Sequence, residues 1–456
     1  PFLGFVLNPK LRQLWAVAKQ ATREPRHFEK NGGLTVRECR NATMPMHLGP
    51  SFLYYFFFDC AIFYFMNYIE QEMPKAGDTV IVGMSGGIDS TLTALLLLER
   101  GCKVIGATMS LWDGKLPEGV NIEELPPSCY SPAELKNIEE CRAFCEQHGM
   151  EYYVVDVKQE YQDFVLSYFK NEYRSGRTPN PCIQCNATVK FGAFLKGLEK
   201  LNVPFDYFCT GHYAKIVRPE SGLFGTDSKP CMISGATDVT KDQTYFLYRI
   251  PSTILEKVRF PLANITKKEV FELAEKANLA AAKRKESQDF VGEEFFDMIF
   301  SDKPSIPGDI VDLDGKVLGK HKGIEHYTIG QRRGLGVAVS YPVYVQAIDA
   351  KKNIVVLAPN DALNAPFLIA DNFVWPGNVE PSEPVEAMVK IRLASRPVKA
   401  IIEKYVPKED EIQDFCGTSW KVTFEEQQRA IAPGQSVVMY KDGVIIGGGI
   451  IAKVGK

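Results

Sequence analysis

The strongest constraint on the fold is a glycine-rich turn between a short apolar run and a helical pattern. Residues 79–84 (TVIVGM) have the composition of a buried strand, and residues 85–90 (SGGIDS) form the turn. Residues 91–101 (TLTALLLLERG) then have a helical pattern, and residues 102–112 (CKVIGATMSLW) have that of a second strand. This order opens a parallel α/β sheet, so we predict an α/β fold.

The alternation of helix and strand patterns continues along the chain and then stops. Helical patterns at 132–148 and 159–173 alternate with strand patterns at 151–157 and 205–214. Further β-α units of this kind extend a parallel sheet. We therefore predict that the first domain, which carries the glycine-rich turn, spans residues 77–236.

The second half of the chain has two different patterns. Helical segments, polar turns and the basic cluster Lys283 to Lys285 predict a small helical or mixed central domain over residues 237–307. From Gly308 onward, short alternating strands are separated by Gly, Pro and Asp turns. They predict a small β module over residues 308–363 and a C-terminal β-barrel over residues 364–456.

The first part of the chain does not fit this pattern. An aromatic run occupies residues 51–66, but it contains Asp59 and is shorter than the roughly 20 apolar residues that a membrane-spanning helix needs. It also has no small-residue signal cleavage site. We therefore expect residues 1–76 to be a non-native or disordered leader, with a membrane anchor as the alternative, and we expect no membrane partner.

Composition limits the compartment and the partners. The net charge of -3 gives no overall attraction to polyanions, so any contact with nucleic acid must come from local basic patches. The 11 cysteines are irregularly spaced in a long chain. This spacing favours reduced thiols, metal ligands or catalysis over a disulfide framework, and it predicts a cytoplasmic protein.

The glycine-rich turn has the features of a phosphate-binding loop. Gly86 and Gly87 allow backbone N–H groups to converge on an anion, and the helix that follows contributes its positive N-terminal end. The chain contains no G-x-x-x-x-G-K-[ST] motif, which disfavours the standard P-loop. The turn instead resembles the pyrophosphate loop of the ATP-pyrophosphatase enzymes, whose fold is adenine nucleotide alpha hydrolase-like and Rossmann-like.

A second motif lies in residues 177–186 (RTPNPCIQCN), where two prolines stiffen a turn before a C-x-x-C pair. The pair places two sulfurs close enough for metal, cluster or disulfide chemistry. A zinc ribbon would show a second C-x-x-C, and the chain has none. Cys141 and Cys145 are four residues apart on a predicted helix, a spacing typical of packing residues.

Together these segments resemble the tRNA-specific 2-thiouridylase family over nearly all of the chain from residue 77. The resemblance rests on GMSGGIDS, RTPNPCIQCN followed by VKFG, TGHYAK, KDQTYFL and HYTIGQRRGLG. It implies ATP-dependent adenylation of the wobble uridine, position 34, at O2, followed by sulfur transfer that yields 2-thiouridine, AMP and pyrophosphate. It also implies tRNAs for Lys, Glu and Gln as substrates and a cysteine desulfurase or sulfur relay protein as the donor.

The resemblance further implies roles for individual residues, with ATP and Mg²⁺ as cofactors. It makes Cys185 the catalytic cysteine. The ATP-binding residues it implies are Gly83, Met84, Ser85, Gly86, Gly87, Ile88, Asp89, Ser90, Met109 and Gly211. The tRNA-binding residues it implies are Asn180, Pro181, Cys182, Lys241, Asp242, Gln243, Arg392 and Leu393, and we add Arg332, Arg333 and Lys283 to Lys285 as candidate phosphate contacts.

The chain departs from the family at both cysteine positions. Cys182 stands where the family usually has aspartate, and Asp289 stands roughly where the second catalytic cysteine is expected. Two explanations remain open. In the first, Cys182 becomes the persulfide or disulfide partner of Cys185. In the second, both cysteines ligate an iron–sulfur cluster such as [4Fe-4S], with Asp289 or Cys209 as a third ligand.

Two other function classes fit parts of the sequence. A small-molecule adenylating ligase or amidotransferase-type ATP pyrophosphatase would use the same loop, but it leaves the C-x-x-C motif without a task. A non-catalytic RNA-binding or sulfur-carrier protein would require an eroded loop, and this loop is intact.

Overall fold

The computed structural model describes residues 67–116, 128–283, 290 and 293–455. Almost all of the predicted leader lies outside these residues, and so does Asp289. Strand β1 (Tyr68–Glu70) pairs antiparallel with β6 (Ala214–Pro219), so regular structure begins before residue 77. In the part of the chain that is described, no helix is long and apolar enough to cross a membrane.

Five parallel strands form the first sheet, in the order β4-β3-β2-β5-β8. Side chains alternate between its two faces, so Ile81 and Phe208 lie in one core cluster while Val80 and Cys209 lie in another. The strands are β2 (Thr79–Gly83), β3 (Lys103–Ser110), β4 (Glu151–Asp156), β5 (Tyr207–Cys209) and β8 (Val258–Arg259).

The sheet extends beyond residue 236, where the sequence pattern placed the end of the first domain. Its last strand, β8, has only two residues, which is too short to show an alternating pattern. The segment before it also differs from the prediction, because β6 and β7 (Met232–Gly235) form an antiparallel hairpin outside the parallel sheet.

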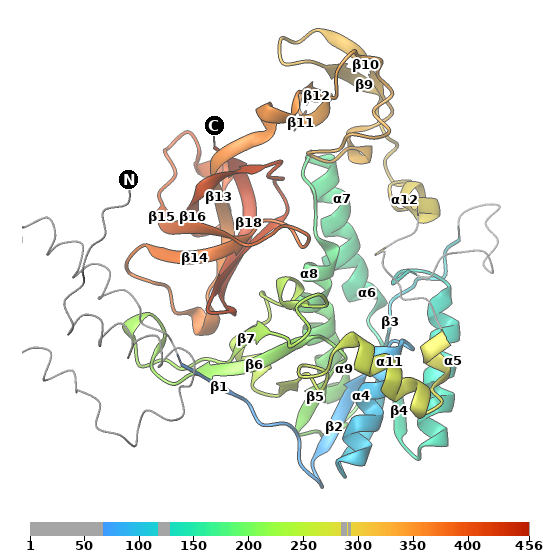
Figure 1. Ribbon diagram of the computed structural model, residues 1–456. Coiled ribbons are helices and arrows are strands. Elements are labelled where there is room, and N and C mark those ends of the chain that lie inside the picture. Colours follow the sequence, from blue (N-terminus) through green and yellow to red (C-terminus); the bar gives the residue numbers. More distant parts are fainter. Residues whose placement is uncertain (1–66, 117–127, 284–289, 291–292, 456) are drawn as a thin grey trace, which may run out of the picture. The chain divides into compact units, whose positions relative to one another are not determined.

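Helices cover both faces of the parallel sheet (Figure 1). One face packs against α4 (Ile88–Glu99) and α5 (Ala133–Gln147). The other face packs against one continuous helical run, α8 (Pro181–Cys185), η4 (Asn186–Ala193) and α9 (Phe194–Lys200). Beside it lies a second run, α6 (Lys158–Tyr161), η3 (Gln162–Leu166) and α7 (Ser167–Arg174). The middle segments η3 and η4 are π-helical.

The remaining helices are short and lie after residue 220. The α-helices are α10 (Ser252–Leu255), α11 (Lys267–Lys276) and α12 (Glu293–Ile299). The 3-10 segments are η5 (Leu223–Gly225), η6 (Thr244–Phe246), η7 (Ala280–Lys283), η8 (Ile324–His326), η9 (Asn360–Leu363), η10 (Pro376–Asn378) and η11 (Ile412–Asp414).

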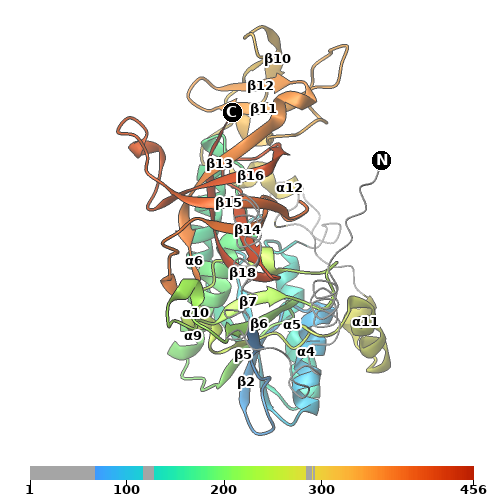
Figure 2. The same ribbon diagram turned by 60° about the vertical axis from the view of Figure 1, so that its left-hand side comes forward.

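The C-terminal region is the predicted β-barrel. Six antiparallel strands close into a ring in the order β13-β16-β15-β14-β17-β18, around a core that includes Trp420 and Val422 (Figure 2). Strand β7 pairs with β18, which joins the barrel to the β6–β7 hairpin. The barrel strands are β13 (Asn364–Val374), β14 (Val385–Lys390), β15 (Val398–Tyr405), β16 (Ser419–Arg429), β17 (Ser436–Lys441) and β18 (Val444–Val454).

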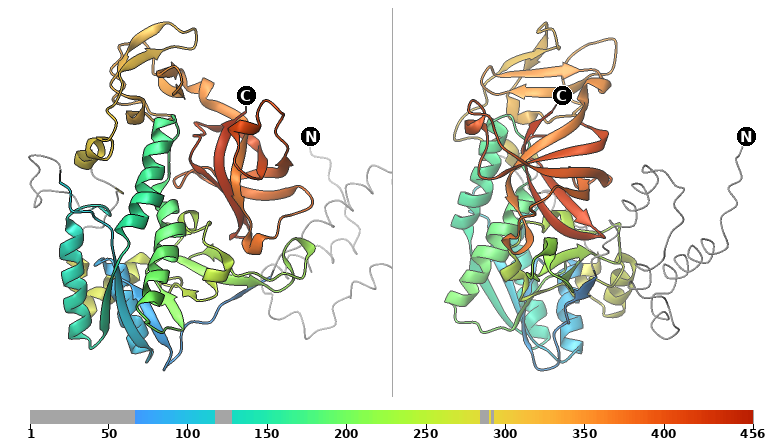
Figure 3. Two further views of the ribbon diagram at one scale, coloured as in Figure 1. Left: turned by 180° about the vertical axis from the view of Figure 1, so that it is seen from behind. Right: turned by 90° about the vertical axis from the view of Figure 1, so that its left-hand side faces the viewer.

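A separate four-stranded sheet precedes the barrel in the chain (Figure 3). Its strands pair in the order β10-β9-β12-β11, and only β9 and β12 run parallel. They are β9 (Gly308–Val311), β10 (Val317–His321), β11 (Tyr344–Asp349) and β12 (Ile354–Ala358).

Candidate active site

The glycine-rich turn connects β2 to the N-terminus of α4, at the carboxyl end of the parallel sheet. Gly86 has a φ of 76°, a left-handed conformation that favours glycine. The Ser85 N–H donates to Ser90 Oγ at 3.2 Å, and Ser90 Oγ donates to the Gly87 carbonyl at 3.1 Å. These bonds set the shape of the turn at the positive end of a 12-residue helix, which suits it to bind an anion.

A pocket of about 210 Å³ opens beside this turn. Seven of the ten predicted ATP-binding residues line it, and the other three, Gly86, Gly87 and Ile88, lie in the same turn. The pocket lining comprises Gly83, Met84, Ser85, Asp89, Ser90, Ala107, Met109, Lys190, Phe194, Thr210, Gly211, His212 and Gln243.

Gly211 brings the segment after β5 against the start of α4. A Cβ at this position would lie 2.7 Å from the Asp89 carbonyl carbon and 2.9 Å from the Ser90 nitrogen. Both contacts are with backbone, which has little room to move away. The glycine therefore permits the close approach that closes one side of the pocket.

Asp89, at the pocket wall, is held by two partners from other segments. Its carboxylate pairs with Lys267 Nζ at 2.8 Å and accepts a hydrogen bond from Tyr213 Oη at 2.8 Å. The Tyr213 N–H in turn donates to Gln243 Oε1 at 2.9 Å. Gln243, which the resemblance assigns to tRNA, thus lines the pocket beside the glycine-rich turn.

Lys190 and His212 are the two titratable side chains of the pocket lining that had no role in the sequence interpretation. Thr210 Oγ1 and His212 Nδ1 are 2.6 Å apart. Burial holds the pKa of His212 well below its usual value, and the nearby Lys190 charge lowers it further, so the imidazole is neutral at pH 7. Both residues stand in the runs TGHYAK and VKFG, but neither run shows by itself that its side chain reaches a pocket.

The C-x-x-C pair lies on α8, the start of the long helical run. Asn180 caps this helix, because its Oδ1 accepts from the Ile183 N–H at 3.2 Å, and Pro181 occupies the first turn. Cys182 and Cys185 are three residues apart on the helix, and both are half-buried. That spacing places their side chains on one helix face.

Burial and the Lys190 charge shift the pKa of the two thiols in opposite directions. Burial raises the pKa of Cys182 to about 12, and the thiolates of Cys129 and Cys185 add to this. Burial also raises the pKa of Cys185 to about 11. The Lys190 charge lowers the pKa of both thiols. Lys190 thus lines the pocket beside the glycine-rich turn and favours the thiolate form of both cysteines.

The segment before the C-x-x-C motif is held by a loop of the C-terminal barrel. The Thr178 N–H donates to the Pro433 carbonyl at 2.7 Å. Gln435 Nε2 donates to the carbonyls of Thr178 and Pro179, at 3.2 and 2.9 Å. The position of the cysteine motif therefore depends on residues more than 250 positions away.

The other residues assigned to tRNA by resemblance lie apart from the pocket lining. Arg392 is partly buried, and its guanidinium donates to the carbonyls of Ile329 and Ala430, both at 2.8 Å. Asp242 accepts from the Thr244 N–H at 3.0 Å and so stabilises a turn. Lys241 and Leu393 of this group are exposed, and so are Arg332 and Arg333, the added candidate phosphate contacts.

The expected third cluster ligands are not brought to the cysteine pair within the described residues. Cys209 is fully buried on the opposite face of the parallel sheet from the cluster against which Cys185 packs. Asp289 lies outside the described residues. Among the residues that are described, no group of three or more His, Cys, Asp or Glu side chains could hold a metal ion.

The fold and the site define a class of protein: a nucleotide-binding α/β enzyme with a C-terminal barrel and a thiol pair at the start of the helical run that also lines its pocket. Three family models match in succession. They are a tRNA methyl transferase HUP domain over residues 78–293, a tRNA methyl transferase PRC-barrel domain over 294–359 and an aminomethyltransferase beta-barrel domain over 366–451. The HUP match implies that the enzyme uses ATP.

Curated relatives specify the family. The chain is 41% identical to the tRNA-specific 2-thiouridylase MnmA of Endomicrobium trichonymphae, over 84% of this chain and 100% of that protein. It is 42% identical to MnmA 1 of Syntrophus aciditrophicus, over 82% of this chain and 92% of that protein. The chain belongs to the tRNA-specific 2-thiouridylase family.

One solved structure with some similarity is the U34-tRNA thiolase NcsA from Methanococcus maripaludis with its [4Fe-4S] cluster. It is 19% identical, covers 50% of this chain and 64% of that chain, and has a TM-score of 0.29. This similarity is too low to bear on the site.

Proposed function

We propose that the protein is a tRNA-uridine 2-sulfurtransferase that converts the wobble uridine of tRNAs for Lys, Glu and Gln to 2-thiouridine. The observation that carries this proposal is that one helical run begins with the C-x-x-C thiols on α8 and then, on η4, brings Lys190 into the pocket lining. The Lys190 charge also lowers the pKa of both thiols. Sulfur transfer requires the adenylated uridine to contact the sulfur nucleophile. A helical run that carries the thiols and lines the pocket is suited to bring the two together.

The proposed reaction has two steps, adenylation of the uridine and then sulfur transfer. The turn at Ser85 to Ser90 holds the ATP phosphates, and a bound Mg²⁺ would neutralise part of their charge. The uridine O2 attacks the α-phosphorus, and pyrophosphate leaves. Sulfur carried by Cys185 then attacks C2, and the C2–O bond breaks as AMP departs with the electron pair. The base must leave the anticodon stack to reach the pocket.

The source of sulfur and the fate of the thiols complete the proposal. A cysteine desulfurase or a sulfur relay protein delivers the sulfur as a persulfide. Within the described residues, no third His, Cys, Asp or Glu joins Cys182 and Cys185 in a group that could hold a metal ion. A small-molecule adenylating ligase would use the same loop, but its reaction would give Cys182 and Cys185 no chemical role.

The test measures product and nucleotide together. Expression in a strain that lacks 2-thiouridine should restore it, as detected by mass spectrometry of tRNA nucleosides. The purified enzyme should release AMP and pyrophosphate only when tRNA is present. Stimulation by an amino acid or a free nucleotide instead of tRNA would support the ligase, and release of ADP would contradict both functions.

Gly211→Ala tests the pocket itself. The added methyl group would clash with the backbone of Asp89 and Ser90, so AMP formation should fall by at least tenfold. Gly319→Ala is the matched control, because its Cβ would meet the end of the Val337 side chain at 3.1 Å and the Gly336 carbonyl oxygen at 3.7 Å, which is an ordinary van der Waals distance. Equal activity in the two variants would show that ATP does not bind at this pocket.

A further inference from the structure

Lys267, to which the sequence interpretation gave no role, is the first residue of helix α11. Thr266 caps this helix: its Oγ1 accepts from the Glu269 N–H at 3.3 Å, and the Glu269 carboxylate accepts from the Thr266 N–H at 2.8 Å. The N-terminal end of a helix carries positive charge, so an ammonium group in the first turn is unfavourable. Lys267 is also only 7% exposed. A buried charge at this end of a helix requires a partner of opposite charge.

That partner is Asp89, in the first turn of α4. Lys267 Nζ lies 2.8 Å from each of the two carboxylate oxygens of Asp89. The Lys267 N–H donates to Asp238 Oδ2 at 2.9 Å, and Lys267 Nζ lies 5.2 Å from the centroid of the Phe271 ring, one turn further along α11. Backbone and side chain are therefore both held in place.

The packing of α11 against α4 fixes the two residues relative to each other. Val270 and Ala274 of α11 are fully buried, and they lie in one core cluster with Ile88 and Leu92 of α4. Ile88 directly precedes Asp89. The ammonium group is thus brought to the glycine-rich turn by a packed helix.

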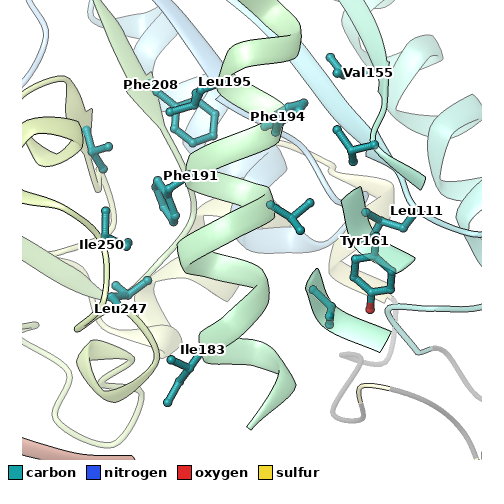
Figure 4. Close-up of a cluster of buried hydrophobic side chains, with 14 of the residues drawn as sticks. Leu111, Val155, Tyr161, Ile183, Phe191, Phe194, Leu195, Phe208, Leu247 and Ile250 are labelled. Atoms are coloured by element: carbon teal, nitrogen blue, oxygen red, sulfur yellow. The ribbon is translucent and has the colours of Figure 1, made fainter. Parts of the chain in front are cut away.

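The charges of the pocket lining explain why such a partner matters. Asp89 and Lys190 are the charged side chains of the lining at pH 7, because the low pKa of His212 leaves it neutral. Phe194, which lines the pocket from the same helical run as Lys190, is an apolar side chain of the core cluster in Figure 4. The two charges of the lining cancel. Lys267, which reaches Asp89 from outside the lining, makes the local charge positive.

The helix dipole alone could not offset the carboxylate. The N-terminus of α4 contributes about half of a positive charge, whereas the Asp89 carboxylate in its first turn carries a full negative charge. An unpaired Asp89 would therefore make this end of the helix repel phosphate. An ion pair that only stabilised the fold would be equally important for every ligand of the pocket. One that sets the charge of the pocket is important only for charged ligands.

Resting on the proposed function, we propose that Lys267 is a positioning residue for ATP, which neutralises Asp89 so that the glycine-rich turn can accept the phosphates. Lys267 acts through Asp89 and not through contact with the nucleotide. Its effect therefore depends on the charge of the ligand. ATP requires Lys267, whereas adenosine, which has no phosphate, does not.

The test compares the Kd values of ATP and adenosine, measured by titration calorimetry on the full-length protein without tRNA. Lys267→Met retains the length and the apolar stem of lysine but removes its charge. The Kd of ATP should rise at least about tenfold, whereas the Kd of adenosine should stay within about twofold of wild type. The titrations contain EDTA, so that no divalent cation screens the charge of Asp89.

Two further variants are the controls. Lys268→Met removes the neighbouring lysine of the same helix, which is exposed and pairs with Glu272 at 3.5 Å, and it should bind both ligands as wild type does. The double variant Lys267→Met/Asp89→Asn removes both charges of the pair and should bind ATP within about threefold of wild type. It contains no unpaired carboxylate, so it decides the question even if Lys267→Met does not fold.

An equal loss of ATP and adenosine binding in Lys267→Met would show a structural role and overturn the proposal. So would wild-type ATP binding by Lys267→Met, or a double variant that binds ATP about tenfold more weakly than wild type. Absence of ATP binding by wild type in the presence of Mg²⁺ would instead refute the ATP dependence of the proposed function.

Discussion

Lys190 lines the pocket from the helical run that begins with the C-x-x-C thiols. Its charge lowers the pKa of His212 and of three thiols, those of Cys129, Cys182 and Cys185. Burial acts on the thiols in the opposite direction and is the larger effect. The thiols of the free enzyme are therefore mostly protonated at neutral pH, which protects them from oxidation until sulfur is delivered.

Replacing Lys190 with methionine should remove both effects. Because the Lys190 charge favours the thiolates, alkylation of Cys185 by iodoacetamide should become roughly several-fold slower in Lys190→Met. ATP-dependent AMP formation should fall as well, and Lys190→Arg should recover part of both activities.

The pH dependence of Cys185 alkylation tests whether the Lys190 charge acts on this thiol. The pKa of Cys185 is about 11, so its thiolate fraction, and with it the alkylation rate, should rise about tenfold per pH unit from pH 7 to 9. Peptide mass spectrometry measures the rates, with the exposed Cys416 as an internal reference. An unchanged Cys185 rate in Lys190→Met would show that the charge does not act on this thiol.

At the scale of elements, the central feature is the helical run from α8 through η4 to α9. The π-helical turn spans Asn186–Ala193, directly after Cys185, and carries Lys190. A π-helical turn changes the angular spacing of the side chains before and after it, and such turns are frequent at functional sites. Here one helix supplies the C-x-x-C thiols at its start and a pocket residue further along.

Two substitutions of Asn180 can separate its role in capping helix α8 from a role in tRNA contact. Asn180→Ala removes the acceptor for the Ile183 N–H and should lower the free energy of unfolding by about 1 kcal/mol. Asn180→Ser retains a capping hydroxyl and should stay within a few tenths of a kcal/mol of wild type. If Asn180 also contacts the target base, the serine variant should still thiolate tRNA more slowly.

Urea unfolding and single-turnover thiolation, measured on the same preparations, decide between these roles. A serine variant with wild-type stability and wild-type thiolation would restrict Asn180 to capping. An alanine variant as stable as wild type would show that the cap contributes nothing.

At the scale of the whole described chain, the C-terminal barrel contributes to the site through its loop at Pro433 to Gln435. Gln435 satisfies two backbone carbonyls immediately before the C-x-x-C motif, those of Thr178 and Pro179. The Cβ that Gly434 lacks would lie 2.8 Å from the Thr178 carbonyl oxygen. This loop therefore fits closely against the cysteine segment.

Gln435→Ala should loosen that segment. The carbonyls of two buried residues would lose their donor, which predicts a loss of about 1–3 kcal/mol in the free energy of unfolding and slower thiolation. Hydrogen exchange of the amides in residues 177–183 should accelerate. Gln428→Ala is the control, because its amide bonds only to nearby backbone, at Glu426 and Gln427. Identical exchange in the two variants would contradict the anchoring role.

The parts that could be predicted from sequence are those fixed by local chemistry. The strand–turn–helix with Gly86 and the C-x-x-C turn need only nearby residues, and the alternating strands of the barrel show their pattern directly. The positions of Lys190 and Lys267 depend on packing between distant segments, so no local pattern reveals them. The same holds for Arg392, whose guanidinium is bound by the carbonyls of Ile329 and Ala430.

The hydrogen bond between Thr178 and the barrel loop determines when, during translation, the thiol site can form. A ribosome makes the glycine-rich turn and the C-x-x-C motif long before it reaches Pro433, whose carbonyl accepts from the Thr178 N–H. The β-strand that ends at Val454 supplies a further contact, because the Ile451 carbonyl accepts from Arg177. A nascent chain that has folded its first domain thus still has an unanchored cysteine segment. The thiol site is completed only after the last strand has left the ribosome.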